Sequence, residues 1–509
     1  MTTAPVPWTT PQRWTVAAAV LGSSLAFLDG SIVNVALNAI QRYFGSGVAG
    51  SQWIVNGYML MLAALILTGG ALGDRYGRRL VFGLGVAIFA VASLGCGLAP
   101  TLNVLIAGRV LQGVGGALLI PGSLAMIGVL FDDAGRGRAV GLWSAATSAT
   151  SLLGPVLGGL LVQLSWRWAF LINLPLAVLV LLCLRQVPET RSPGAQPPDL
   201  FGSLLAAVGL GLLTFALIQA GGPAGAGGLG GPLPLGLLGA ALLLGFVLWE
   251  AREQHPMLPL TLFRRPAFSG TTVLTLLLYG ALGALTFFLP LNLIGVQGYT
   301  PAQAGAALVP LALLLTVLSG PVGRWSAHTG PRLFLTAGPL TCAVAFAVFA
   351  RTSLGGSYWQ SFFPAIVVLG LGLSLTVAPL VSAVLGSVEP EYSGTASGVN
   401  NAVSRTGGLL AVAALGLVML GSFRSDLSRQ LHSQQQPPAV TQSMLAQADR
   451  LAQVPIPAGP AARTAQLRGS VQRAFVAGFQ RVSWWCAALS LLAAVTALLS
   501  FRAGPARDR

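Results

Sequence analysis

Residues 70–79 read GALGDRYGRR, so that three glycines, one acid and three arginines occupy ten positions between two long apolar stretches. The flanking stretches cover about residues 51–72 and 79–99. Each is long enough to cross about 30 Å of hydrocarbon as a helix that rises about 1.5 Å per residue. The pattern therefore predicts two membrane-spanning helices joined by a short charged turn on one side of a bilayer.

Composition extends this prediction to the whole chain. Of the 509 residues, 54% are hydrophobic and only 8% are charged, whereas roughly a quarter of a soluble domain is charged. All 28 basic residues are arginine. They lie scattered in short loops without interleaved aromatics, so the net charge of +15 does not indicate a nucleic-acid partner. Without lysine the chain has no Walker A phosphate loop and no Schiff-base lysine.

Apolar runs of spanning length recur along the sequence, and each is too long and too uniformly apolar for a barrel strand. The first run is also too long for a cleaved signal peptide, so we expect a retained helix. The expected fold class is an all-α polytopic membrane protein. The fourteen predicted spans are residues 14–40, 51–72, 79–99, 102–125, 137–162, 166–184, 200–220, 232–249, 267–290, 301–323, 333–350, 357–386, 395–420 and 474–501.

The arginines favour one side of the membrane on alternate loops, and the positive-inside rule assigns that side and both termini to the cytoplasm. The predicted location is the cell membrane, inner or plasma. Short loops on the outer side hold only Arg42, Arg167 and Arg351. The predicted inner arginines are Arg13, Arg75, Arg78, Arg79, Arg136, Arg138, Arg185, Arg191, Arg252, Arg264, Arg265, Arg324, Arg332, Arg502, Arg507 and Arg509.

The longest predicted outer loop, residues 421–473, is rich in Gln, Pro and Ala and carries six arginines. Loops approaching this length translocate largely regardless of charge. We expect here either a short helix near Thr441 to Leu451 or disorder. A periplasmic or other envelope partner for the loop stays open.

Cysteine and histidine indicate no cofactor. The four cysteines all lie within predicted helices, where we expect them to be packing residues. The three histidines lie in loops without the spacing of metal ligands. We therefore expect neither a metal site nor a bound cofactor.

Two proline-rich junctions divide the predicted helices. The first contains Pro188, Pro193, Pro197 and Pro198, and the second contains Pro256, Pro259 and Pro266. The expected domains are an N-terminal six-helix bundle (1–190), a linker with two extra spans (191–263) and a C-terminal six-helix bundle (264–509). The glycine-arginine turn recurs in weaker form at residues 320–332, with Ala327 where an acid would be expected. The halves therefore look like parallel repeats.

These features resemble the major facilitator superfamily, and within it the fourteen-helix drug:proton antiporters, over nearly the whole chain. Residues 70–79 match the superfamily pattern G-x-L-G-D-R-x-G-R-R. The resemblance implies a transporter rather than an enzyme, with a binding site between two bundles that rock. Glycines let helix ends approach, and Asp74 can pair with arginines or cap the next helix. The implied cytoplasmic gate is Gly70, Gly73, Asp74, Arg75, Gly77, Arg78 and Arg79; a positive-inside anchor alone is the alternative.

The first span carries an acid in apolar surroundings. Residues 28–37, LDGSIVNVAL, resemble the family element L-D-x-T-x-V-N-V-A-L, and Asn38 replaces its usual proline. At about 1.5 Å per residue Asp29 lies roughly 16 Å deep. A buried carboxylate costs several kcal/mol to ionise unless it is paired. Asp29 is therefore the candidate proton carrier, and a satisfied hydrogen bond between helices is the alternative.

The fourth span carries a base. Residues 108–116, GRVLQGVGG, resemble the family element G-R-x-x-Q-G-x-G-G. Arg109, roughly 10 Å deep, stays charged and needs an acceptor. Its long stem can bridge the difference in depth, so we predict that Arg109 pairs with or tunes Asp29. Bonding only to backbone carbonyls is the alternative.

Residues 154–159, GPVLGG, resemble the element that marks antiporters in this superfamily. Gly154 and Gly158 form a small face for close packing, Pro155 bends the helix and frees a carbonyl, and Gly159 completes the element. The resemblance favours export over uptake. Generic packing of membrane helices is the alternative.

Arg405 is the only strong charge inside the second predicted bundle, and no acid lies between Arg265 and Glu389. A divalent lipophilic cation would gain nothing from such a wall. We therefore expect monovalent cationic, zwitterionic, neutral or anionic substrates, although aromatic and apolar walls bind cations too. The candidate cavity residues are Phe27, Asn34, Trp53, Tyr58, Gln112, Tyr279, Phe287, Asn401 and Arg405; aromatics at these spacings are more often core or lipid-facing.

The expected function is secondary active export of amphipathic drugs from the bilayer or cytoplasm in exchange for protons, by alternating access. The proton gradient replaces any cofactor. The alternatives are an exporter dedicated to one lipid, siderophore or antibiotic, an uptake symporter, and a membrane receptor or scaffold.

Overall fold

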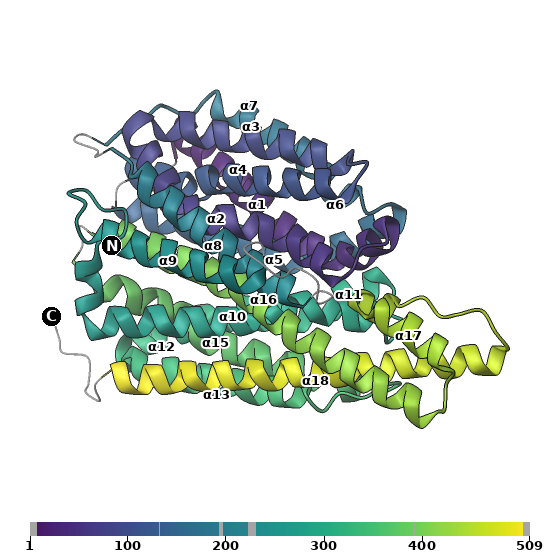
Figure 1. Cartoon of the computed structure of the whole chain (residues 1–509). Coiled ribbons are helices and arrows are strands. Elements are labelled where there is room, and N and C mark those ends of the chain that lie inside the picture. The colour runs from purple at the N-terminus through teal and green to yellow at the C-terminus, as the bar shows by residue number, and fades with distance from the viewer. Residues whose placement is uncertain (1–7, 132, 193–196, 222–230, 390–391, 502–509) are drawn as a thin grey trace.

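The computed structural model describes residues 8–131, 133–192, 197–221, 231–389 and 392–501, and these residues are almost entirely helical. Long helices lie side by side in two lobes, one formed by the first part of the chain and one by the last part (Figure 1). Pro193, Arg502, Arg507 and Arg509, which entered the sequence predictions, lie outside the described residues.

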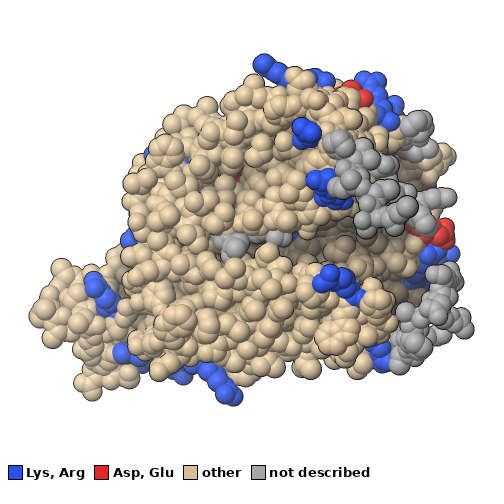
Figure 2. Space-filling view, turned by 180° about the vertical axis from the view of Figure 1, so that it is seen from behind, with Lys and Arg blue, Asp and Glu red and all other residues tan. Residues whose placement is uncertain are grey.

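The described chain begins and ends at the same face of the molecule, which we call the terminal face (Figure 1). Residues 421–473 project beyond the opposite face, which we call the loop face. Basic side chains gather around the terminal face, whereas the visible sides are mostly uncharged (Figure 2). Exposed leucines, valines and tryptophans cover these sides, as expected for a surface in contact with lipid.

The first lobe starts with a helix that is well defined at both ends. Thr9 and Gln12 form a capping box at its start, and Gly45 ends it with a φ of 61°, which favours glycine. The helix continues through Asn38 without a break. The helices of this lobe are α1 (Thr10–Phe44), α2 (Val48–Tyr76), α3 (Arg78–Gly97), α4 (Leu102–Leu130), α5 (Asp133–Leu164), α6 (Trp168–Leu171) and α7 (Asn173–Leu184).

Two helices connect the lobes, α8 (Leu200–Ala220) and α9 (Pro232–Glu250). They pack against each other, and α8 also packs against α2 of the first lobe and against α16 of the second. The hydroxyl groups of Thr68 on α2 and Ser203 on α8 are hydrogen-bonded. The pair is therefore attached to both lobes.

The second lobe repeats two local motifs of the first, a capping box and a glycine with positive φ before a helix. Thr300 and Gln303 form a capping box, as Thr9 and Gln12 do. Gly330, with a φ of 86°, precedes α13 just as Gly77, with a φ of 124°, precedes α3. The elements of this lobe are η1 (Leu260–Arg264), α10 (Pro266–Gly295), α11 (Pro301–Ala306), α12 (Val309–Thr329), α13 (Pro331–Phe349), α14 (Tyr358–Ser361), α15 (Phe363–Gly386), α16 (Ser393–Ser433), α17 (Pro438–Ala446), η3 (Ala448–Gln453) and α18 (Ala461–Ser500).

The all-helical, multi-pass fold class predicted from the sequence is confirmed. Among the described residues, twelve helices are long and apolar enough to cross a membrane. The fifth predicted span lies within α5 and the sixth covers α6 and α7; in these, the stretches Leu153–Leu164 and Trp168–Leu184 count as shorter apolar helices. The number fourteen and the domain boundaries at residues 190 and 263 stay predictions.

The prediction for residues 421–473 was wrong in part. The two flanking helices extend beyond the predicted spans 395–420 and 474–501: α16 continues to Ser433 and α18 already begins at Ala461. Their extensions pack together through buried apolar side chains, Leu427, Leu431, Leu467 and Val471. The expected short helix is present as two pieces, α17 and η3, with Leu451 at a φ of 49° in the second. We call residues 421–473 the outer hairpin.

Candidate functional site

Asp29 and Arg109 form an ion pair inside the first lobe. Arg109 Nη1 lies 2.5 Å from Asp29 Oδ2, and the residues are 1% and 0% exposed, respectively. They come from α1 and α4, which pack against each other. Removing one partner of such a buried pair typically costs about 3–5 kcal/mol, because the other charge is left without compensation.

Two side-chain amides hold the second oxygen of the same carboxylate. Gln112 Nε2 donates to Asp29 Oδ1 at 3.1 Å, and Asn173 Nδ2 donates to the same oxygen at 3.0 Å. Both amides also donate to the hydroxyl of Ser93, at 2.7 and 3.3 Å. Each oxygen of the carboxylate therefore has a hydrogen-bond partner, as buried polar groups require.

Arg109 is fixed independently of the carboxylate. Its Nη1 also donates to Gln112 Oε1 at 2.7 Å, and its Nε donates to the backbone oxygen of Ile54 at 3.0 Å. The Tyr58 ring lies 4.5 Å from its Cζ, a distance typical of a cation–π contact. A proton on Asp29 would remove the main charge partner while these other contacts keep the guanidinium in place. The site can thus exchange an ion pair for a neutral acid beside a cation.

The glycine element of α5 lies where the two lobes meet near the loop face. A Cβ at Gly154 would lie 2.7 Å from Ser31 Cβ, and one at Gly158 would lie 2.9 Å from Ile32 Cα, both on α1. Gly159 faces α11 of the second lobe, where a Cβ would lie 2.5 Å from Ala302 Cα. These glycines therefore permit α5 to touch α1 on one side and the second lobe on the other.

Residues 70–79 form a charged cluster at the terminal face. Arg78 donates to Asp74 Oδ1 through Nε at 2.9 Å and through Nη2 at 2.6 Å. Ser192, after α7, accepts a hydrogen bond from Arg78 Nη2 at 2.7 Å, and its backbone NH donates to the Asp74 carbonyl oxygen at 2.9 Å. The cluster ties the α2–α3 turn to the chain that leaves the first lobe. Within the described residues Arg75 contacts Tyr76 but has no ion pair.

An acid that we did not predict completes this cluster. Glu189 accepts hydrogen bonds from the backbone NH groups of Arg79 and Leu80, both at 3.0 Å, at the start of α3. Negative charge is favourable there because these NH groups have no partner within the helix. Gly77 leaves room for it, since a Cβ there would lie 2.6 Å from the Glu189 carboxyl carbon.

The structure places the candidate cavity residues in different surroundings. Phe287 is 1% exposed and packs edge to face on Phe288 within a buried apolar cluster that includes residues of both lobes, and its assignment to the cavity stays a prediction. Trp53 contacts Phe215 of α8 and faces the connecting helices. Gln112 and Tyr58 belong to the buried site around Arg109.

The other cavity candidates are only partly buried. Asn34 and Asn401 donate to backbone oxygens of their own helices, those of Gly30 and Ser397. Phe27, Tyr279 and Arg405 are neither fully buried nor fully exposed.

Sequence reasoning missed Asn173 and Ser93. Asn173 is the only polar residue in the apolar stretch 168–184, and this isolation was a usable signal. Ser93 gave no signal, because small hydroxyl residues are common in membrane helices. Among the described residues no group of three or more His, Cys, Asp or Glu is placed to hold a metal ion. The four cysteines are buried free thiols.

Two lobes of long apolar helices, one of which holds a buried charge pair, are the arrangement of a multi-pass membrane transporter. The sequence matches the family described as Major Facilitator Superfamily over residues 19–412, and the chain belongs to that family.

Relatives of similar length are known. The chain is 34% identical to the tetracenomycin C resistance and export protein of Streptomyces glaucescens, over 98% of this chain and 92% of that one. It is 35% identical to the puromycin resistance protein of Streptomyces alboniger, over 82% and 84%. It is 36% identical to the multidrug resistance protein Stp of Mycobacterium tuberculosis, over 82% and 78%.

Solved structures show the same fold. A bacterial homologue of the human lysosomal transporter Spinster, in an inward-facing and unoccupied conformation, aligns with a TM-score of 0.65 at 18% identity, over 98% of this chain and all of that chain (100%). An auto-inhibited POT family peptide transporter aligns with a TM-score of 0.64 at 16% identity, over 98% and 99%.

Proposed function

We propose that this protein is a proton-coupled exporter of amphipathic small molecules, and that Asp29 carries the proton. The observation that carries the proposal is the buried pair of Asp29 and Arg109, whose charge changes when one proton is added. The relatives named for resistance and export support the direction of transport. The twelve long apolar helices among the described residues support a location in a lipid bilayer.

The coupling follows from the contacts of the ion pair. A proton that enters from outside neutralises Asp29 and weakens its bonds to α4 and α7, and this favours the conformation that returns to the inside. Substrate binding favours release of the proton and opening to the outside. The exchange needs only a few kcal/mol of differential affinity between the two conformations.

We assign the terminal face to the cytoplasm, with both termini inside, because the short loops there carry the excess of arginine. The Asp74 and Arg78 cluster is then the inner gate. The contact between Gly159 and α11 is then the outer closure, and Figure 2 shows a hollow between the lobes that extends toward the terminal face. The candidate substrate wall between the lobes comprises Phe27, Asn34, Tyr58, Tyr279, Asn401 and Arg405.

An exporter dedicated to one antibiotic is the second candidate function. Its support is that the tetracenomycin C and puromycin relatives are each named for one compound. A broad toxin panel separates the two functions. A multidrug exporter protects cells against several unrelated compounds, whereas a dedicated exporter protects against one.

Energised everted membrane vesicles test the direction of exchange. The lumen is acidified by the respiratory chain and followed with a pH-sensitive dye, and each panel compound is then added. We expect an active compound to release protons from the lumen in vesicles that contain the protein and not in vesicles without it. Compound and proton moving in the same direction would show symport and refute the proposal.

A further inference from the structure

Arg405 of α16 is a cation between the two lobes and has no counter-ion among the described residues. Its side chain is half-buried, and its Nε is shielded from solvent and has no hydrogen-bond partner within the described chain. One turn further, a side chain at Gly408 would contact Met59 of α2 and the backbone of Tyr279 of α10. This part of α16 therefore lies where helices of both lobes meet.

The surroundings of Arg405 supply donors but no acid. Both oxygens of Asp29 are already bound by partners within the first lobe. Helices α10 to α15 contribute no acid, because none lies between Arg265 and Glu389. Tyr58 and Tyr279 are within electrostatic reach of Arg405. Neither tyrosine hydroxyl forms a hydrogen bond with a described residue, so both are free to donate.

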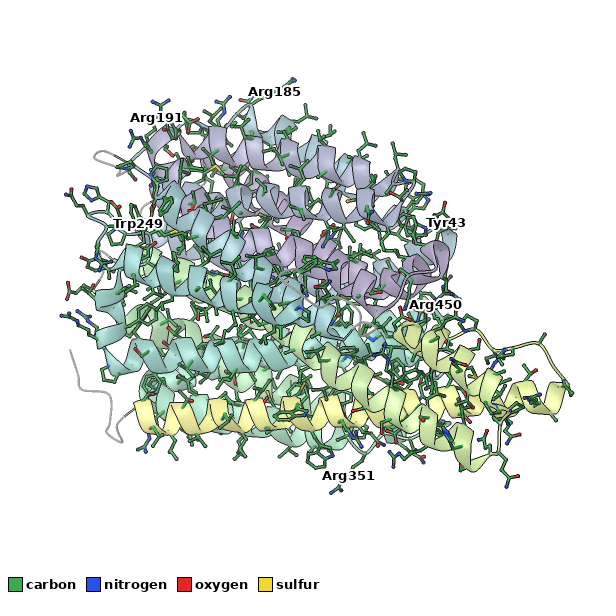
Figure 3. The ribbon with its side chains drawn as sticks, in the orientation of Figure 1. Tyr43, Arg185, Arg191, Trp249, Arg351 and Arg450 are labelled. Carbon is green, nitrogen blue, oxygen red and sulfur yellow. The ribbon has the colours of Figure 1, made fainter. Side chains whose placement is uncertain are left out.

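A second donor-rich place lies at the loop face. A cavity of about 450 Å³ is bounded by α1, α10 and η3, and its lining includes Asn38, Gln41, Arg42, Arg450 and Gln453. Within the described residues neither of its arginines has an ion pair, although Asp449 is the neighbour of Arg450 in η3. Figure 3 shows the labelled Arg450 and Tyr43, the neighbour of Arg42, at this end of the molecule.

Building on the proposed export function, we propose that the exported compound carries an acidic group, a carboxylate or an ionised phenol, and that Arg405 binds this group between the lobes. A charge inside a membrane protein is costly unless a partner compensates it. An acidic substrate supplies that partner, and the hydroxyls of Tyr58 and Tyr279 donate to its other oxygens. The cavity with Arg42 and Arg450 then lies on the exit path of the substrate toward the loop face.

Charge movement distinguishes this inference from export of cations. Exchange of one anion for one incoming proton moves two charges in the same electrical sense, so an inside-negative membrane potential accelerates it. Exchange of one monovalent cation for one proton moves no net charge and is insensitive to the potential.

Two dyes with the same xanthene ring system provide matched probes. Fluorescein carries a carboxylate and a phenolate, whereas rhodamine 6G is an esterified cation. The purified full-length protein is reconstituted in vesicles with an imposed pH gradient and a potential set by potassium and valinomycin. We expect fluorescein to be transported faster than rhodamine 6G, and faster still when the potential favours anion exit.

Substitutions assign the effect to Arg405. We expect Arg405→Gln to lower fluorescein transport about tenfold or more, which is the loss of one hydrogen bond to a charged group. Arg405→Lys should recover part of it, and Arg351→Gln, at the exposed surface, should change nothing. Quenching of fluorescein on binding to the native protein gives a second readout if Arg405→Gln does not fold.

The outcomes separate the two proposals. Rhodamine 6G transported in preference to fluorescein, or equal fluorescein transport by Arg405→Gln, would overturn the acidic-substrate inference and leave the exporter standing. Absence of proton-driven movement of both dyes and of the toxin panel, in a folded preparation, would overturn the exporter and this inference with it.

Discussion

Replacing Gly159 with alanine should shift the protein away from the conformation closed at the loop face. A Cβ at this position would lie 2.5 Å from Ala302 Cα and closer still to the Pro301 carbonyl oxygen. Both obstacles are backbone atoms of α11, so no side chain can rotate away. Overpacking of this kind costs about 1–3 kcal/mol, which corresponds to a change of about 5-fold to 150-fold in the balance between two conformations.

A distance measured across the lobes reports this balance. Leu164 at the end of α5 and Trp359 in α14 are 78% and 67% exposed, so spin labels at both sites are tolerated. Pulsed electron resonance on Gly159→Ala should show a larger population with a long distance between the labels. Gly141→Ala on the same helix is the matched control, because a Cβ there meets no atom within 4 Å.

A reciprocal contact, from a glycine of α11 to the backbone of α5, provides a second variant. A Cβ at Gly305 of α11 would collide with the Pro155 carbonyl group. Gly305→Ala should therefore shift the distances in the same direction as Gly159→Ala. Identical distance distributions in the native protein, Gly159→Ala and Gly141→Ala would refute the conclusion that this contact closes the loop face.

Two further predictions concern the ends of the molecule. Gln453 of η3 donates to Asn38 Oδ1 of α1 at 2.9 Å, so a short thiol cross-linker between Asn38→Cys and Gln453→Cys should stop transport until the link is reduced. A link between Gln434→Cys and Ser470→Cys, both within the outer hairpin, should leave transport unchanged. Equal transport by both linked proteins would contradict this prediction. Gly77→Ala should lower the thermal unfolding temperature in detergent, because a backbone φ of 124° costs a non-glycine residue about 1–3 kcal/mol. An unchanged unfolding temperature would show that this backbone conformation does not strain alanine.

The pairing of Asp29 with Arg109 could be predicted from the depth of each residue along its helix. Asp29 and Arg109 stand alone in apolar surroundings, and a count of about 1.5 Å per residue brings them within the reach of one arginine stem. A charge without a partner is costly in such surroundings, so the pairing follows from elementary electrostatics. The amides of Gln112 and Asn173 could not be predicted equally well, because the rotation of each helix about its axis decides which way a side chain points.

The differences between expectation and structure have physical causes as well. Phe287 has a residue type that suits a cavity, but it is buried in an apolar cluster with residues of both lobes, and the packing of neighbouring helices decides how α10 is rotated. In the outer hairpin, Gln and Pro suggested a loop. The spacing of Leu427 and Leu431 nevertheless gives α16 an apolar stripe that is buried against α18, and this stripe extends both helices.

The structure shows a contact of Asn38 that the sequence did not predict. It replaces a proline of the family element, and its side chain and backbone oxygen both accept hydrogen bonds from Gln453. Gln41, one turn further along α1, donates to the Arg450 carbonyl oxygen at 3.4 Å. The outer hairpin is thus attached to the first lobe at the very helix that carries Asp29.

The most direct test of the account compares uphill transport with exchange in reconstituted vesicles that contain Asp29→Asn. Asparagine keeps the shape of the side chain but cannot release a proton. The account predicts that accumulation driven by a pH gradient is lost, while exchange of labelled for unlabelled substrate without a gradient continues. Asp426→Asn in the outer hairpin, where the acid pairs with Arg429 near the surface, should retain both activities. Gradient-driven accumulation by Asp29→Asn at the native rate would contradict the central claim that Asp29 carries the proton.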